Sequence, residues 1–379
     1  MARAYLDHAS SSPLRPAALE AMLPYLREHH ADPGRLHAEG RTTRVALEDA
    51  RVQVAEFFGA RPREVVFTSS GTESVNTAVW GALSRGTHAD GGAGHVVTTA
   101  VEHSSVRDAV IRTDAAVSVV GVDGSGHFDA ADVIAALRAD TRLVTVQLAN
   151  HEVGTLQPVA EICAAARERG TVVHVDACAA AGHAQVDFRA LGADLCSVTA
   201  HKLGGPKGAG ALLVRRGLRF APLLVGGAQE RARRAGIEDV PAWVGFGAAC
   251  AAIDLDREAA AQRALISAAA SVIERVPDVE RFGSGVDAAT LPHLLCLGVR
   301  GVEAEPILLA LDQHGVAVHS GSACSSEVLE PSPVLEAMGA DADRSLRVSV
   351  GWSSTDDDAT KLLDALPGIV GALRALRSP

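Results

Sequence analysis

The sequence is poor in aromatic residues, which make up 3% of the chain, whereas apolar residues of all kinds make up 47%. Aliphatic side chains must therefore fill the core. The sequence also lacks an apolar run long enough to span a bilayer, and its first residues lack the basic start and apolar segment of a secretory signal. We therefore expect a soluble protein of the cytoplasm with no membrane partner.

Closely spaced cysteine pairs are absent as well. The six cysteines are scattered without a CxxC pair, which argues against a zinc ribbon and, in a chain of this length, against a disulfide framework. We expect reduced thiols and no metal site. The cysteines are Cys163, Cys178, Cys196, Cys250, Cys296 and Cys324.

Basic residues are fewer than acidic ones, 35 against 46, and the formal net charge is −11. Long-range electrostatics then oppose nonspecific adhesion to nucleic acid or to an anionic membrane. We therefore expect no direct binding to nucleic acid, although a local basic patch is compatible with this charge.

Short apolar segments alternate with stretches of helical periodicity through most of the chain. This alternation is typical of an α/β domain with a mostly parallel sheet. Later, an alanine-rich helical stretch after about Ala248, two short strands and a helix from Asp356 predict a smaller α+β domain. We place the large domain at 15–250 and the small domain at 1–14 together with 251–379. The expected strands are 65–68, 95–99, 116–120, 143–148, 172–176, 195–199, 210–214, 294–299 and 346–350, and the expected helices include 42–58, 72–83, 130–139 and 159–169.

The most informative stretch is SVTAHKLGGPKGAG at 197–210, directly after an expected strand. A lysine at the end of a strand, flanked by hydroxyl and imidazole donors and by glycines, suits a Schiff-base lysine beside a phosphate site. Taken alone, the stretch also fits a glycine-rich turn with a solvated Lys202.

A carboxylate ends another expected strand, VVHVD at 172–176. Asp176 in that position can hold a pyridinium nitrogen protonated, which makes pyridoxal phosphate an effective electron sink. The alternative is a helix-capping or surface aspartate.

A Ser/Gly turn joins a strand to a helix in VVFTSSGTE at 65–73. Backbone N–H groups and the positive end of the helix dipole suit a phosphate dianion there. The turn matches neither the G-x-x-x-x-G-K-[ST] loop nor the G-x-G-x-x-G fingerprint, so it gives no support for ATP or NAD.

A single cysteine, Cys324, lies in the small-residue loop HSGSACSSEVLEPS at 319–332. Such a loop can present a nucleophilic thiol to solvent. Isolated cysteines are more often buried and inert, and we keep that interpretation for the other five.

Together these stretches resemble the class I cysteine desulfurases, the NifS-like and IscS-like members of the class V aminotransferase family. The resemblance runs nearly from end to end, and several separated motifs in the right order make it specific. The motifs are YLDHA at 5–9, TSSGTESVN at 68–76, EH at 102–103, NHEVG at 150–154, HVD at 174–176, HK at 201–202, SGSAC at 320–324 and Arg347.

The resemblance implies fold type I, similar to aspartate aminotransferase, with pyridoxal 5'-phosphate as the cofactor. It also implies a homodimer with active sites at the subunit interface. The implied activity converts L-cysteine to L-alanine and leaves a persulfide on Cys324. A sulfur-acceptor protein would then take the sulfur.

Roles carried over from the family are these. Lys202 resembles the lysine that binds the cofactor, His103 the imidazole that stacks on the cofactor ring and moves protons, and Asp176 the partner of the ring nitrogen. Residues at the family's cofactor-binding positions are Gly71, Thr72, His103, His151, Asp176, Thr199, His201 and Lys202, and those at its substrate-binding positions are Asn150 and Arg347, the latter placed to hold the substrate carboxylate.

Three residues depart from the family pattern. His151 replaces the second asparagine of N-N-E-x-G, and Ala179 replaces a glutamine that also bonds the cofactor's phenolic oxygen. We hypothesise that His151 takes over that bond. Ile237 replaces a threonine lent by the partner subunit, which leaves one phosphate hydrogen bond to be made by another group.

Two other functions are compatible with the pattern. Another reaction of the same fold, such as an aminotransferase or a cysteine β-lyase, has no use for Cys324 on a loop. A catalytically inactive scaffold in a sulfur-transfer complex has no need of both Lys202 and Cys324. The loop that continues to LEPS at 329–332 favours direct delivery of sulfur, but the acceptor stays open among an iron–sulfur scaffold, a tRNA-thiolation protein, a thiocofactor pathway and a DNA-phosphorothioation complex.

Overall fold

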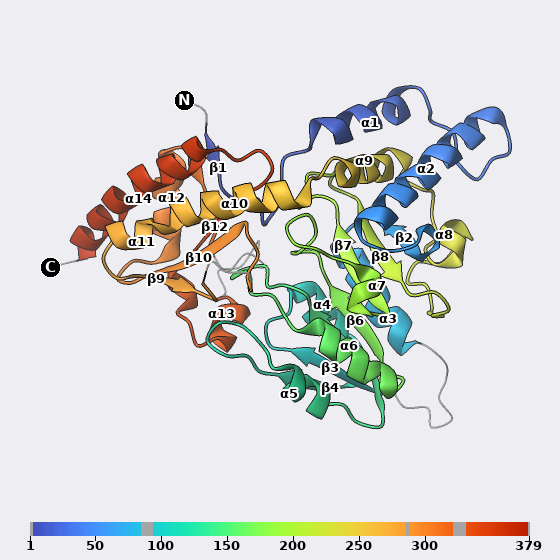
Figure 1. Ribbon diagram of the computed structural model, residues 1–379, viewed down its shortest axis with the longest axis horizontal. Helices are drawn as coiled ribbons and strands as arrows, with labels where there is room; N and C mark the ends of the chain where they lie inside the picture. The colour runs from blue at the N-terminus through green and yellow to red at the C-terminus, as the bar shows by residue number, and fades with distance from the viewer. Residues whose placement is uncertain (1–2, 85–93, 286–288, 321–330, 378–379) are drawn as a thin grey trace.

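A seven-stranded sheet forms the centre of the larger part of the molecule (Figure 1). The computed structural model describes residues 3–84, 94–285, 289–320 and 331–377. The strand order is β2-β8-β7-β6-β5-β3-β4, and neighbouring strands are parallel except in the pairs that involve β8. The strands are β2 (Val65–Thr68), β3 (His95–Thr99), β4 (Ala116–Val120), β5 (Thr141–Gln147), β6 (Val172–Asp176), β7 (Leu195–Thr199) and β8 (Gly210–Val214).

Helices bury both faces of this sheet, which explains why its strands have nearly continuous apolar sequences. Successive side chains point to opposite faces: Val65 and Phe67 join one apolar cluster, and Val66 between them joins another. Helices α3 and α4 cover the face of Val66, and α2, α6 and α9 cover the opposite face. The helices around this sheet are α1 (Pro16–Arg27), α2 (Ala38–Phe57), α3 (Gly71–Leu83), α4 (Ser104–Ile111), α5 (Ala130–Ala135), α6 (Val159–Glu168), α7 (Phe188–Leu191), α8 (Gln229–Ala232) and α9 (Val240–Ala251), with a 3-10 turn, η1, at Pro62–Glu64.

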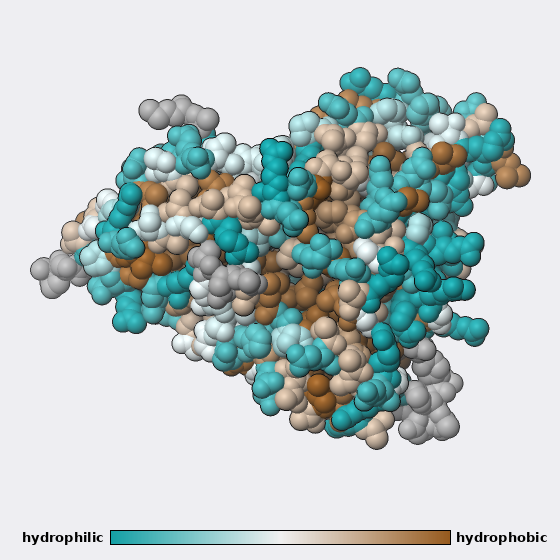
Figure 2. Space-filling model, viewed as in Figure 1, coloured by the Kyte–Doolittle hydropathy of each residue, from teal (hydrophilic) through white to brown (hydrophobic). Residues whose placement is uncertain are grey.

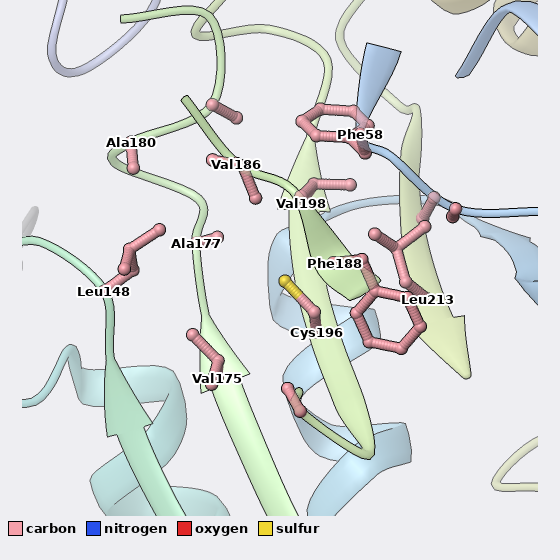
Figure 3. Packing of buried hydrophobic residues seen from close by; sticks show 14 of the residues in the cluster. Phe58, Leu148, Val175, Ala177, Ala180, Val186, Phe188, Cys196, Val198 and Leu213 are labelled. Atoms are coloured by element: carbon pink, nitrogen blue, oxygen red, sulfur yellow. The ribbon is translucent and has the colours of Figure 1, made fainter. Parts of the chain in front are cut away.

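Close packing in the larger cluster holds the central strands in place. Cys196 of β7 lies between Val175 of β6 and Leu213 of β8, and the rings of Phe58 and Phe188 pack in the same cluster (Figure 3). Interiors packed in this way deform little. The carboxyl ends of β6 and β7 are therefore held in a fixed relation.

A second group of elements lies at the other end of the molecule (Figure 1). It contains an antiparallel sheet of order β12-β10-β9 and the parallel pair β1-β11. The extreme N-terminal Leu6 and the C-terminal Leu362 share its apolar cluster, so both ends of the described chain are anchored there. Its elements are β1 (Ala4–Tyr5), α10 (Leu255–Ala270), α11 (Val272–Arg275), β9 (Val279–Phe282), β10 (Leu294–Val299), α12 (Ala304–Gln313), β11 (Val316–Ala317), α13 (Pro333–Ala337), η2 (Ala342–Arg344), β12 (Ser345–Ser349) and α14 (Asp356–Arg377).

The strands expected from the sequence are confirmed, with small shifts at their ends. The helix expected at 130–139 was predicted too long, because α5 ends at Ala135. The N–H of Arg138 donates to Thr141 Oγ1 at 2.7 Å, which closes a turn that leads directly into β5. The alanine-rich stretch is likewise interrupted, because Asp254 caps α10 by accepting from the N–H of Arg257.

No helix within the described residues is long and apolar enough to cross a membrane. Polar side chains cover most of the face seen in Figure 2, with apolar surface gathered near its middle. The described cysteines carry free thiols, as expected: Cys163, Cys178, Cys196, Cys250 and Cys296.

Two buried histidines join the two groups of elements. The imidazole rings of His183 and His293 stack with their centroids 3.5 Å apart and their planes at 13°. His183 Nδ1 lies 3.0 Å from Gln262 Oε1 on α10. Burial lowers the pKa of His183 from 6.5 to about 4, and burial lowers the pKa of His293 well below 6.5. Both rings are therefore neutral in the folded protein at neutral pH.

We predict acid lability from this pair. Because the folded-state pKa values lie below the unfolded value, the unfolded chain binds more protons below pH 6.5, so the stability present above that pH is lost toward pH 4. The free energy of unfolding should fall by about 1.4 kcal/mol per pH unit for each histidine. Urea unfolding at a series of pH values measures it. His183→Gln should have a shallower slope, whereas the exposed His314→Gln should match the wild type; equal slopes in all three proteins would contradict the prediction.

Candidate active site

A cavity of about 220 Å³ lies where the parallel strands of the large sheet end. In sheets of this kind, the carboxyl ends of the strands meet at one edge, and ligands bind there. Gln147, Asp176 and Thr199 are the last residues of β5, β6 and β7, and all three line the cavity. The structure brings together most of the site residues expected from the sequence: Gly71, Thr72, His103, His151, Asp176, Thr199, His201, Lys202 and Arg347.

Asp176 ends β6, Lys202 follows the end of the neighbouring parallel strand β7, and both line the cavity. One carboxylate oxygen of the buried Asp176 accepts the N–H of Cys178 at 3.0 Å. The backbone at Lys202 is held from the other side, because Ser12 Oγ donates to the Lys202 carbonyl at 2.8 Å. A buried carboxylate and an amine therefore reach one cavity from rigid positions.

The N-terminus of α3 forms one wall of the cavity. Ser70 caps this helix and accepts the N–H of Glu73 at 3.1 Å, while Gly71 and Thr72 face the cavity. A side chain at position 71 has no room, because a Cβ there would lie 2.5 Å from Cys178 Sγ. The N-terminus of α3 therefore borders the cavity, and its backbone N–H groups and helix dipole favour negative charge there.

Hydroxyl and imidazole groups continue this wall. Thr199 Oγ1 lies 3.0 Å from His201 Nδ1. Burial, with the charges of Lys202 and Lys207, lowers the pKa of His201 from 6.5 to about 4. His201 is therefore a neutral hydrogen-bonding group at neutral pH.

The His103 imidazole has a defined tautomer. His103 is the N-cap residue of α4, and its Nδ1 accepts the N–H of Ser105 at 3.0 Å. In the neutral ring the proton is therefore on Nε2. Behind it, burial raises the pKa of Glu102 to about 8, so this carboxyl group is largely protonated at neutral pH.

Arg347 of β12 carries a cation into the cavity from the second group of elements. Its Nη2 donates to Asp7 Oδ1 at 3.0 Å and to Ser10 Oγ at 2.7 Å, and its Nη1 donates to the carbonyl of His151 at 3.2 Å. Its buried Nε–H has no hydrogen-bond partner among the described residues. This donor is suited to a ligand carboxylate.

Asn150 does not line the cavity. It is fully buried, its Oδ1 accepts the N–H groups of Glu152 and Val153 at 2.8 and 2.9 Å, and its Nδ2 donates to the carbonyl of Val101. The geometry therefore gives no support to the substrate-binding role expected of it, because its polar atoms are used to shape the turn that presents His151. Cys324 lies outside the described residues.

Several residues that line the cavity were not expected from the sequence. Gln147 Nε2 is buried without a hydrogen-bond partner among the described residues. The sequence signal for Gln147 was a polar residue at the end of an apolar strand. No sequence signal identified Ser105, whose hydroxyl contacts the His103 ring in the structure. For Cys178, the only signal was its position two residues after Asp176.

The residues present fit pyridoxal phosphate. A phosphate fits the N-terminus of α3, where only a glycine leaves room at position 71. The pyridine nitrogen fits Asp176, the aldehyde carbon fits the amine of Lys202, and the buried Nε2 of Gln147 is an unused donor beside them. Fold and site together define a pyridoxal-phosphate enzyme of fold type I.

Comparisons with known proteins identify the family. The model of the aminotransferase class-V family matches residues 4–362. The cysteine desulfurase IscS of Dictyoglomus turgidum is 39% identical over 98% of this chain and 95% of its own length, and cysteine desulfurase IscS 1 of Archaeoglobus fulgidus is 37% identical over 98% of both chains. The chain therefore belongs to the aminotransferase class-V family and, within it, to the cysteine desulfurases, whose cofactor is pyridoxal phosphate.

Solved structures agree in fold. A NifS-like protein superposes with a TM-score of 0.89 at 28% identity, over 98% of this chain and all of the other. A structure described as SspA in complex with cysteine gives a TM-score of 0.80 at 28% identity, over 93% of this chain and 99% of the other. The fold class expected from the sequence is confirmed.

Proposed function

We propose that the protein removes the sulfur atom of L-cysteine, releases L-alanine and holds the sulfur as a persulfide on Cys324 for delivery to an acceptor protein. The observation that carries the proposal is the meeting of Lys202, Asp176, His103 and Arg347 in one cavity at the strand ends. Family membership supports the same reaction.

Substrate binding is assigned to Arg347. Its guanidinium is held by Asp7 and Ser10 and still has a buried Nε–H to offer to the cysteine carboxylate. A fixed guanidinium loses little side-chain entropy when it binds a carboxylate. We assign the orientation of the substrate to this contact.

Cofactor binding is assigned to the opposite walls of the cavity. Pyridoxal phosphate, once bound, withdraws electrons from the substrate and so weakens its carbon–sulfur bond. Asp176 keeps the ring nitrogen protonated, and Lys202 holds the cofactor and takes the α-proton of the substrate. The phosphate is held by residues at the N-terminus of α3 and beside it: Gly71, Thr72, Thr199 and His201.

The sulfur acceptor is assigned to Cys324 rather than to another cysteine. Burial raises the pKa of every described thiol: Cys163, Cys178, Cys196, Cys250 and Cys296. A protonated thiol is a poor nucleophile. The loop cysteine therefore remains the best candidate.

We also propose two domains, 15–250 and 1–14 with 251–379, and a homodimer. Separate apolar clusters around the two sheets support the domains. Exposed apolar side chains between β8 and α9 support the dimer. Leu224 is 41% exposed, Val225 79% and Ile237 70%. Neighbouring exposed apolar side chains are typical of protein–protein interfaces.

The test is incubation of the purified holoenzyme with L-cysteine. We expect one L-alanine for each sulfur transferred, measured by amino-acid analysis, with sulfide released when a thiol reductant is added. Formation of pyruvate in place of alanine would identify a β-lyase and contradict the proposal. A requirement for a keto acid would identify an aminotransferase.

A further inference from the structure

A buried carboxylate lies against the His151 imidazole. His151 Nε2 lies 3.4 Å from Glu152 Oε1, and the two side chains are 7% and 2% exposed. The other carboxylate oxygen, Glu152 Oε2, accepts a 2.5 Å hydrogen bond from Ser332 Oγ. Glu152 is therefore fixed between an imidazole that lines the cavity and a hydroxyl at the start of α13.

The backbone that carries this pair is held at several points. Asn150 Oδ1 accepts the N–H groups of Glu152 and Val153, and Arg347 Nη1 donates to the carbonyl of His151. Ser332 also accepts the N–H of Leu335 as the cap of its helix. The relation between the imidazole and the carboxylate is therefore part of the fold.

The carboxylate favours one tautomer of His151. Because Glu152 Oε1 lies 3.4 Å from Nε2, a proton on Nε2 is stabilised and Nδ1 is left as the basic nitrogen. A carboxylate behind an imidazole also stabilises the imidazolium form. Next to it, the ring of His103 meets the ring of His151 edge to face, with centroids 5.1 Å apart and planes at 70°. Two imidazoles of fixed orientation therefore lie side by side in the cavity wall.

We propose that His151 is a second proton carrier beside His103 and that Glu152, held by Ser332, is its positioning residue. The inference rests on the proposed function. In that reaction a thiol loses one proton and the carbon that becomes the alanine methyl group gains one. The S–H bond breaks and an N–H bond forms on one imidazole. The carbon–sulfur bond breaks as the thiolate of Cys324 forms the sulfur–sulfur bond, and the carbon keeps the electron pair of the broken bond. That pair takes the proton when the N–H bond breaks and the new C–H bond forms. No electrons are gained or lost by the histidines.

Charges around the pair act in both directions. The cations of Arg347 and Lys202 oppose an imidazolium on His151, whereas the carboxylates of Glu152 and Asp176 favour it. Glu102 lies close to both Asp176 and His151, and it favours the imidazolium only when its own carboxyl group is ionised. Its pKa of about 8 keeps that carboxyl group mostly neutral at pH 7. Glu152 is the carboxylate in direct contact with the ring, so its removal should have the largest effect.

The test uses the holoenzyme and the variants Glu152→Gln and His151→Asn. Glu64→Gln is the matched control, because Glu64 is also a buried carboxylate, but it binds the N–H groups of Arg61 and Arg216 away from the cavity. The first readout is the visible absorbance of the bound cofactor against pH, without cysteine. The second is the pH dependence of kcat/KM for alanine formation.

We expect Glu152→Gln to bind the cofactor and to move the absorbance midpoint and the acidic limb of kcat/KM by about one pH unit to lower pH. Glu64→Gln should superimpose on the wild type. Superimposable curves for Glu152→Gln and the wild type in both measurements would overturn the proposal. If Glu152→Gln does not fold, the His151→Asn variant provides the test. Loss of one titration step of the resting enzyme would support the proposal, and an unchanged titration would overturn it.

The two proposals fail separately. A wild-type enzyme that makes no alanine from cysteine would contradict the proposed function. The titration of the resting enzyme contains no cysteine, so it would still report whether Glu152 sets the charge of His151.

Discussion

Lys202→Ala should lose both alanine formation and the visible absorbance of the bound cofactor. Lys202 supplies the only lysine amine among the described residues that line the cavity. We assign to this amine both the covalent attachment of the cofactor and the removal of the substrate α-proton. Its loss therefore removes two steps of the reaction at once. We expect alanine formation to fall by a factor on the order of 10⁴.

The matched control for this prediction is Lys207→Ala. Lys207 is exposed and lies in the same glycine-rich segment. That variant should keep both the colour and the activity of the wild type. Absorbance spectra of the purified proteins and amino-acid analysis of the products measure both properties. A coloured, active Lys202→Ala enzyme would remove Lys202 from the mechanism.

The sequence predicted the strand-end residues well. Asp176 ends one apolar run and Lys202 follows another, both runs were expected to be strands, and parallel strands bring their carboxyl ends to one edge. The resemblance added His103 and Arg347, whose positions depend on contacts between segments far apart in the chain. Without it, nothing in the local sequence around Arg347 distinguishes a ligand-binding cation from a surface one.

Tertiary contacts explain what the sequence did not predict. Asn150 is adjacent to a residue that lines the cavity, but its amide is consumed by the turn that it caps. Glu152 accepts a hydrogen bond from Ser332, which lies 180 positions away in the sequence, and no periodicity or motif predicts such a pair. The stacking of His183 on His293 is equally non-local. Hydrogen bonds between distant side chains depend on the completed packing, which local patterns do not encode.

The strongest test of sulfur transfer is Cys324→Ser. This variant should bind the cofactor with the wild-type absorbance, because none of the described residues assigned to the cofactor is changed. It should still respond spectrally to L-cysteine, but it should accumulate no persulfide and release sulfide at less than about 1% of the wild-type rate, as expected when a nucleophilic thiol is replaced by a far less acidic hydroxyl.

Cys178→Ser is the matched control, because Cys178 is the described cysteine that lines the cavity. Burial and the nearby Asp176 raise the pKa of its thiol well above 9.0, so at neutral pH it is protonated and a poor nucleophile. We therefore expect Cys178→Ser to keep persulfide formation and turnover. Mass spectrometry of each protein after reaction with L-cysteine locates the added sulfur atom. A persulfide on Cys178 in the Cys324→Ser protein, with turnover intact, would move the acceptor role from the loop cysteine to the cavity wall.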